Sequence, residues 1–165
     1  MNKEIFRNSC FIRRLREAAS ITKEKGVEAG FAVIEFKGKT SFEKIITGLC
    51  DYIRLAVSDP DKADEVCNIH FHPSSSGPIS PSRGDLASLI EDEEEGAPVT
   101  SIGIGQVNDE GDISLLVIDK GKSDIFSIRD AQEEIEKLSF FCHQEEVIEL
   151  LERAGFDFFF LFWPR

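Results

Sequence analysis

Two histidines and a nearby aspartate are the residues of this sequence whose types and spacing best suit chemistry. His70 and His72 are separated by one residue, a spacing that places both imidazoles on the same face of a β-strand. Asp85 follows on the first turn of a predicted helix. Two histidine nitrogens and one carboxylate oxygen are a usual ligand set of catalytic zinc, with a fourth position left open. The pattern predicts a zinc site made of His70, His72 and Asp85.

Each half of this pattern also has a purely structural interpretation. A His-x-His pair on a strand can simply pack or face solvent, and Ser82-x-x-Asp85 is close to a capping box that starts a helix. Residues 73–81 carry three prolines and one glycine, which predicts an irregular loop between the two halves. Such a loop can return Asp85 to the histidines, so we favour one shared metal site.

Helices and strands are interspersed along the chain. The apolar periodicity predicts helices over residues 11–25, 82–90, 129–138 and 144–154. It predicts strands over residues 31–36, 65–72, 99–104 and 113–119. Residues 41–57 fit either a helix or a strand followed by a helix, because Gly48 interrupts the apolar stripe. We therefore expect a mixed α/β fold in a single domain spanning residues 1–165.

Composition and charge narrow the class of protein. The chain has 31 acidic and 19 basic residues, a net charge of −12, which argues against nucleic acid and anionic membrane surfaces as partners. No apolar run approaches the roughly 20 residues of a membrane span, and the N-terminus has no apolar signal core. We expect a cytoplasmic protein whose four scattered cysteines are buried free thiols.

The segment His70-x-His72-Pro73, followed by Pro81-Ser82-x-x-Asp85-Leu86, resembles the signature of the JAMM metalloproteases, also called JAB or MPN-plus domains. The resemblance covers about residues 11–120 and leaves C-terminal helices and an apolar strand in 121–165. It implies a curved mixed β-sheet packed with helices. It also implies a zinc-dependent isopeptidase that cleaves ubiquitin-like conjugates, or sulfur-carrier proteins with a C-terminal extension, by a metal-activated water.

The resemblance further implies roles for two residues outside the ligand set. Family members carry a glutamate just after a helix, at the start of the first core strand. Glu28 occupies that place here and would act as the general base, while the Ser82 hydroxyl would stabilise the oxyanion. Glu35 is the alternative base, although on a continuous strand it faces away from Glu28.

The sequence departs from the family in one loop. Nine residues separate His72 from Ser82, two more than is common in the family, which indicates an expansion within residues 74–79. The expansion keeps open an alternative function, a JAMM-like binding or scaffold module that no longer cleaves. A DNA-repair-associated bacterial branch has a similar His-x-His-Pro motif, but the net charge argues against direct contact with DNA.

Three further features concern the surroundings of the motif. Asn68 shares the face of His70 and is a candidate hydrogen-bonding neighbour of the ligands, whereas Cys67 should face away from them. His143 lies far from the motif and is expected to be structural or exposed. The tail Phe156–Trp163 is too apolar to leave in water, so it is either a strand buried on both faces or a homodimer interface.

Overall fold

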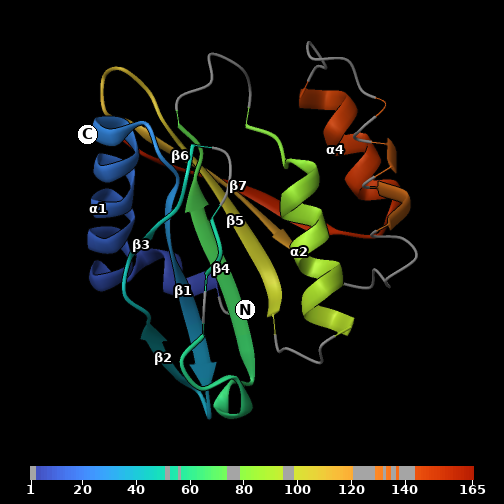
Figure 1. Cartoon of the computed structure of the whole chain (residues 1–165), viewed down its shortest axis with the longest axis horizontal. Helices are drawn as coiled ribbons and strands as arrows, with labels where there is room; N and C mark the ends of the chain where they lie inside the picture. Colours follow the sequence, from blue (N-terminus) through green and yellow to red (C-terminus); the bar gives the residue numbers. More distant parts are fainter. Residues whose placement is uncertain are drawn as a thin grey trace.

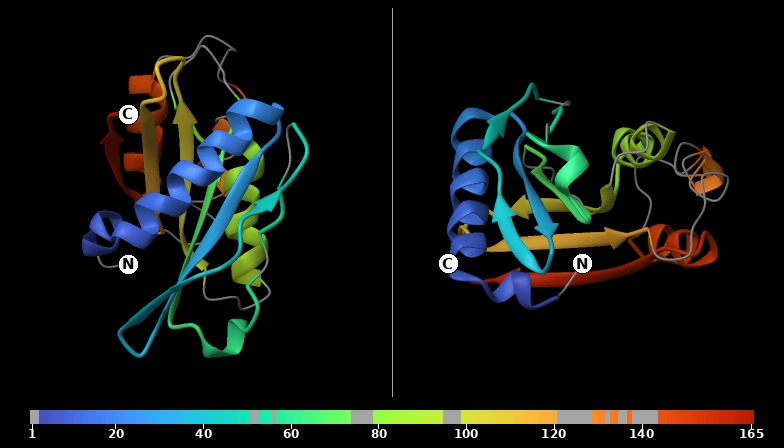
Figure 2. Two further views of the ribbon diagram at one scale, coloured as in Figure 1. Left: turned by 90° about the vertical axis from the view of Figure 1, so that its left-hand side faces the viewer. Right: turned by 90° about the horizontal axis from the view of Figure 1, so that it is seen from below.

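The protein has a mixed α/β fold in which helices cover both faces of one sheet (Figures 1 and 2). The computed structural model describes residues 3–50, 53–55, 57–73, 79–94, 99–120, 129–131, 133–134, 137 and 144–165. Helix α1 lies on one face, and α2 and α4 lie on the other (Figure 2). None of the described helices is both long and apolar enough to cross a membrane.

Local sequence signals mark both ends of helix α1. The bounds of the helices are α1 Ser9–Lys25, α2 Arg83–Glu94 and α4 Gln144–Arg153, with 3-10 helices η1 Lys3–Arg7 and η2 Pro60–Lys62. The Asn8 side chain accepts a hydrogen bond from the Cys10 backbone N–H at the start of α1. Gly26 ends α1 with a φ of 65°, as its position after the apolar stripe predicted.

Two helix predictions need correction or lie partly outside the described residues. Helix α2 continues to Glu94, beyond the predicted end at Ile90, because acidic residues are adequate helix formers. The predicted helix over 129–138 falls only partly on described residues, and His143 falls outside them.

The described residues form a seven-stranded mixed sheet. Its strands are β1 Ala29–Phe36, β2 Lys39–Phe42, β3 Ile46–Thr47, β4 Glu65–Phe71, β5 Val99–Val107, β6 Ile113–Asp119 and β7 Asp157–Trp163. Their order is β2-β1-β4-β5-β6-β7, and β3 also pairs with β1. Strands β4 and β5 are parallel and the other pairs are antiparallel. The four predicted strands are confirmed, and the last two, β5 and β6, form an antiparallel hairpin.

The helical interpretation of residues 41–57 is wrong for the residues described there. Strands β2 and β3 both pair with β1, and no helix covers 41–50. Phe42 and Ile45 are only partly buried, against the core on the α1 side. The apolar spacing was that of a helix, but the free edge of β1 offered backbone hydrogen bonds that a strand could take.

Two apolar cores lie on opposite faces of the sheet. Cys67, Ile69 and Phe71 of β4 point into the core beneath α1, so Cys67 faces away from the histidines as predicted. The other face of β4 packs beneath α2, in a core that includes Val66. Cys10 and Cys50 are exposed, which contradicts the prediction that they are buried, and Cys142 is not among the described residues.

Strand β7 is an edge strand rather than a strand buried on both faces. It pairs with β6 along its whole length, and no described strand pairs with its outer side. Phe160 is 41% exposed and Phe162 is 61% exposed. The prediction of a strand is confirmed and that of burial on both faces is wrong, because Phe160 and Phe162, two residues apart on the same face of β7, are exposed. A homodimer through β7 stays a prediction.

Alanine variants of Phe156 and Phe162 distinguish the loss of a buried side chain from the loss of a dimer contact. Phe156 is 4% exposed, so Phe156→Ala should lower the free energy of unfolding by about 3–5 kcal/mol, measured by urea denaturation. In a monomer, Phe162→Ala should change it by no more than about 0.5 kcal/mol. If β7 forms a homodimer interface, Phe162→Ala should lower the free energy of unfolding by more than this, and the loss should depend on protein concentration. Sedimentation velocity would show the dimer directly.

Candidate metal centre

The end of β4 carries both histidines of the motif. His70 lies on β4, and His72 follows the strand with its backbone N–H donating to the Gly105 carbonyl of β5 at 3.2 Å. The two Nε2 atoms lie 3.0 Å apart. The parallel neighbour β5 therefore holds the chain in an extended course past the end of β4, which keeps both imidazoles on the site side.

Helix α2 supplies the third group from its first turn. Asp85 Oδ1 lies 2.8 Å from His70 Nε2, and Asp85 Oδ2 lies 3.7 Å from His72 Nε2. The Ser82 backbone N–H donates to Asp85 Oδ2, while the Asp85 backbone N–H donates to Ser82 Oγ at 3.2 Å. This reciprocal pair is a capping box. The structural and metal-binding interpretations of Asp85 thus hold together, and the longer loop does not keep Asp85 from the histidines.

The structure places Glu28, not Glu35, beside the histidines. Glu28 precedes β1, and its backbone is held by hydrogen bonds with Leu49 (2.7 Å) and Gly48 (2.8 Å). Its buried side chain places Oε1 3.9 Å from His72 Nε2. Glu35 pairs with Glu65 at the opposite end of the two strands. The antiparallel register of β1 and β4 therefore separates the two candidate bases by nearly the length of the strand.

The donor atoms fit a small, four-coordinate metal ion. Ligand atoms 2.0–2.1 Å from a tetrahedral zinc ion lie about 3.3 Å from one another. The two imidazole nitrogens lie 3.0 Å apart, and His70 Nε2 lies 2.8 Å from Asp85 Oδ1, both close to that value. The 3.7 Å contact of His72 Nε2 is with the other carboxylate oxygen, Oδ2. In the described part of the chain, His70, His72 and Asp85 form the one group whose ligand atoms all lie within 4.8 Å. This buried group can hold a metal ion.

Opposite charges inside the site shift the pKa values of its members. Burial raises the pKa of Asp85, but the charges and hydrogen bonds of His70 and His72 outweigh burial and hold that pKa below its usual range. Burial lowers the pKa of His72, but its hydrogen bond with Asp85 and the charges of Asp85 and Glu28 raise it overall. Without a metal, the carboxylates thus favour a protonated His72.

Gly30 is a residue of the site that the sequence reasoning missed. It pairs with His70 across β1 and β4. A Cβ atom at Gly30 would lie 2.3 Å from the Ile69 carbonyl oxygen and 2.9 Å from Cα and Cβ of His70. A glycine inside a predicted strand was the available signal, because such a glycine often marks a close approach of two backbones.

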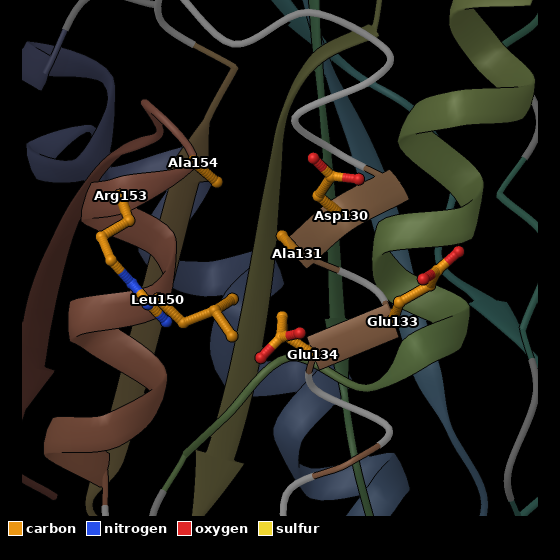
Figure 3. Close-up of a pocket in the computed structure, with 7 residues that line it drawn as sticks. All are labelled: Asp130, Ala131, Glu133, Glu134, Leu150, Arg153 and Ala154. Carbon is orange, nitrogen blue, oxygen red and sulfur yellow. The ribbon is translucent and has the colours of Figure 1, made fainter.

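A separate pocket of about 340 Å³ lies between α4 and the segment that contains Asp130 (Figure 3). Its lining residues are Asp130, Ala131, Glu133, Glu134, Leu150, Arg153 and Ala154. It shares no residue with the group formed by His70, His72 and Asp85, so it is not part of the metal centre.

No family model matches this chain, and no curated protein is significantly similar to it in sequence. The assignment to a class of protein therefore depends on the His-x-His and Ser-x-x-Asp motifs and on the geometry they adopt.

Alanine at position 30 should damage the metal centre more than alanine at position 103. Gly30→Ala places a methyl group against the backbone of β4, whereas the same change at Gly103 meets side-chain atoms alone, a close contact with the end of Ile69 and an ordinary one with Leu115. We expect Gly30→Ala to lower both the free energy of unfolding and the zinc affinity, and Gly103→Ala to lower chiefly the former. Urea denaturation and zinc titration measure the two effects, and equal zinc affinity in both variants would contradict this.

Zinc binding should displace a proton from His72 at mildly acidic pH. A metal binds neutral imidazole, so zinc competes with protons below the raised pKa of His72 and meets no such proton well above it. Calorimetry in buffers of different ionisation enthalpy should show more protons released near pH 6 than near pH 8. Glu28→Gln removes one charge that raises this pKa and should shift the release to lower pH, whereas Glu35→Gln should not.

Proposed function

We propose that this protein is a zinc-dependent peptidase or isopeptidase of the JAMM type. Its proposed substrates are conjugates of ubiquitin-like proteins, or sulfur-carrier proteins with a C-terminal extension. The observation that carries the proposal is the convergence of four groups: His70, His72 and Asp85 as ligands, and the Glu28 carboxylate 3.9 Å from His72. The substrate class comes from the resemblance of the motif to that family.

His70 Nε2, His72 Nε2 and Asp85 Oδ1 would hold the zinc ion. When bound, zinc supplies a Lewis acid that activates water and polarises a carbonyl group at neutral pH. Glu28 would accept a proton from the attacking water and return it to the leaving amine. The position of Glu28 before β1 suits that role, because backbone hydrogen bonds with Gly48 and Leu49 hold this residue beside the three ligands. Glu28 is not itself a member of the ligand group.

Ser82 would orient and stabilise the carbonyl oxygen of the substrate. Its Oγ accepts the Asp85 backbone N–H, which leaves the hydroxyl hydrogen available for donation. Ser82 is exposed and precedes the first residue of α2, where the helix dipole also favours negative charge. A donor in this position would stabilise the oxyanion that forms during amide hydrolysis.

Burial of the carboxylates favours the enzyme over the scaffold. Glu28 and Asp85 are both buried, and removal of carboxylates from water is costly unless their charge is compensated. A scaffold needs no such pair beside two imidazoles, whereas a site that binds a cation and moves a proton needs both.

Metal content and cleavage test the proposal with two matched glutamate variants. Protein purified without chelator should hold about one zinc per chain, lost in Asp85→Ala, as elemental analysis would show. Glu28→Gln should keep the metal and lower by at least about 100-fold the cleavage of ubiquitin-like and sulfur-carrier proteins with a C-terminal peptide extension, followed by mass spectrometry. Glu35→Gln should cleave as the unaltered protein does.

Two results would count against this function. Failure of the unaltered protein to take up zinc or cobalt would exclude the metal centre. Metal uptake without cleavage of any of these substrates would instead favour a binding module, in which Asp85→Ala leaves partner binding unchanged.

A further inference from the structure

Two buried side-chain oxygens have no hydrogen-bond partner among the described residues. They are Thr22 Oγ1 and Asn68 Oδ1. Buried polar atoms in folded proteins are nearly always bonded, and an exception indicates a bound water or another group that completes it. Thr22 lies in α1, on the opposite side of the sheet from the metal centre, whereas Asn68 lies on β4 two residues before His70.

Asn68 and His70 lie on the same face of a regular stretch of β4. In the sheet register, Asn68 stands between Ala32 and Ile102, and His70 stands between Gly30 and Ile104. The one irregularity on β4 falls earlier, between Val66 and Cys67. The alternation of strand side chains therefore directs Asn68 toward α2, on the side where His70 meets Asp85.

The second nitrogen of His70, Nδ1, takes no part in the hydrogen bonds and ion pairs that His70 makes with described residues. The polar contacts of His70 with described residues, to His72 and Asp85, all use Nε2. A histidine that binds a metal through Nε2 carries its proton on Nδ1, and that N–H is normally held by a carbonyl, a carboxylate or a water. The unpartnered oxygen of Asn68 and the unused Nδ1 of His70 thus belong to neighbouring side chains on one face of β4.

We propose that Asn68 is a positioning residue of the metal centre, linked to His70 by one bound water. Same-face residues of a strand lie about 7 Å apart. Asn68 Oδ1 makes no direct hydrogen bond to His70, whereas one water, through two hydrogen bonds of about 2.8 Å each, can link the two side chains. The water donates to Asn68 Oδ1 and accepts the Nδ1–H of His70, which fixes the imidazole with Nε2 toward the metal. This inference rests on the proposed metal centre and extends it to a residue that touches neither metal nor substrate.

Leucine at position 68 separates this role from that of an ordinary buried asparagine. Leucine keeps the approximate size of asparagine and removes the orphan oxygen. Loss of the bridge in Asn68→Leu should weaken zinc affinity by about 10- to 100-fold, measured by competition with a chromophoric chelator. The visible absorption of the cobalt-loaded protein should change as well, since His70 would no longer be held in one orientation. Asn68→Asp keeps the acceptor and should retain the affinity.

Thr22→Val is the matched control, because it removes the other orphan oxygen far from the site. It should raise resistance of the metal-free protein to urea and leave zinc affinity unchanged. If Asn68→Leu behaves in the same way, the positioning role is overturned. If Asn68→Leu does not fold, Asn68→Ala takes its place, with urea denaturation of the metal-free protein as the check on folding.

The outcomes also separate this inference from the proposed function. If the protein binds zinc but cleaves none of the proposed substrates, the proposed function is refuted. The role of Asn68 can still be tested through zinc affinity and the absorption of the cobalt-loaded protein. A protein that binds neither metal overturns both.

Discussion

The close approach of Asp85 to His70 is the interaction on which the site depends. It joins the first turn of α2 to the end of β4, two elements that the chain connects only through a proline-rich segment. A buried carboxylate beside two imidazoles is stable when a cation lies among them, whether a proton or a metal ion. The raised pKa of His72 and the lowered pKa of Asp85 both express this demand for positive charge. The same demand would favour a metal ion bound among these three side chains.

The two carboxylate oxygens of Asp85 have different partners, one in the helix cap and one in the candidate metal site. Oδ2 accepts the Ser82 backbone N–H and so caps α2, while Oδ1 faces His70. Stability of the helix start and geometry of the ligand set are therefore coupled through one side chain. Ser82 is coupled in the same way, because its Oγ accepts the Asp85 backbone N–H and, in the proposed function, its hydroxyl hydrogen would donate to the substrate. A change at either residue affects both properties.

The local patterns predicted most of the fold and the membership of the site. The alternation of strand side chains placed His70 and His72 together, and the Ser-x-x-Asp spacing placed Asp85 on the first helical turn. Long-range effects escaped prediction. The segment after Ser41 became strands because β1 offered it an edge, and the exposure of Phe162 depends on how much of that face of β7 other elements cover. Neither the sheet order nor the close contact at Gly30 is a property of neighbouring residues.

The two sides of the metal centre differ in how firmly the backbone holds them. Gly30 and His70 are paired on adjacent strands, and Glu28 continues the strand that carries Gly30, so this side is one rigid wall. Asp85 belongs to a helix that rests on the sheet through apolar side chains such as Leu86 and Leu89. An ion bound by His70, His72 and Asp85 would thus link the first turn of α2 to the end of β4. Removal of such an ion would therefore weaken the contact between the first turn of α2 and the end of β4, and leave the apolar packing of Leu86 and Leu89 to hold the helix on the sheet.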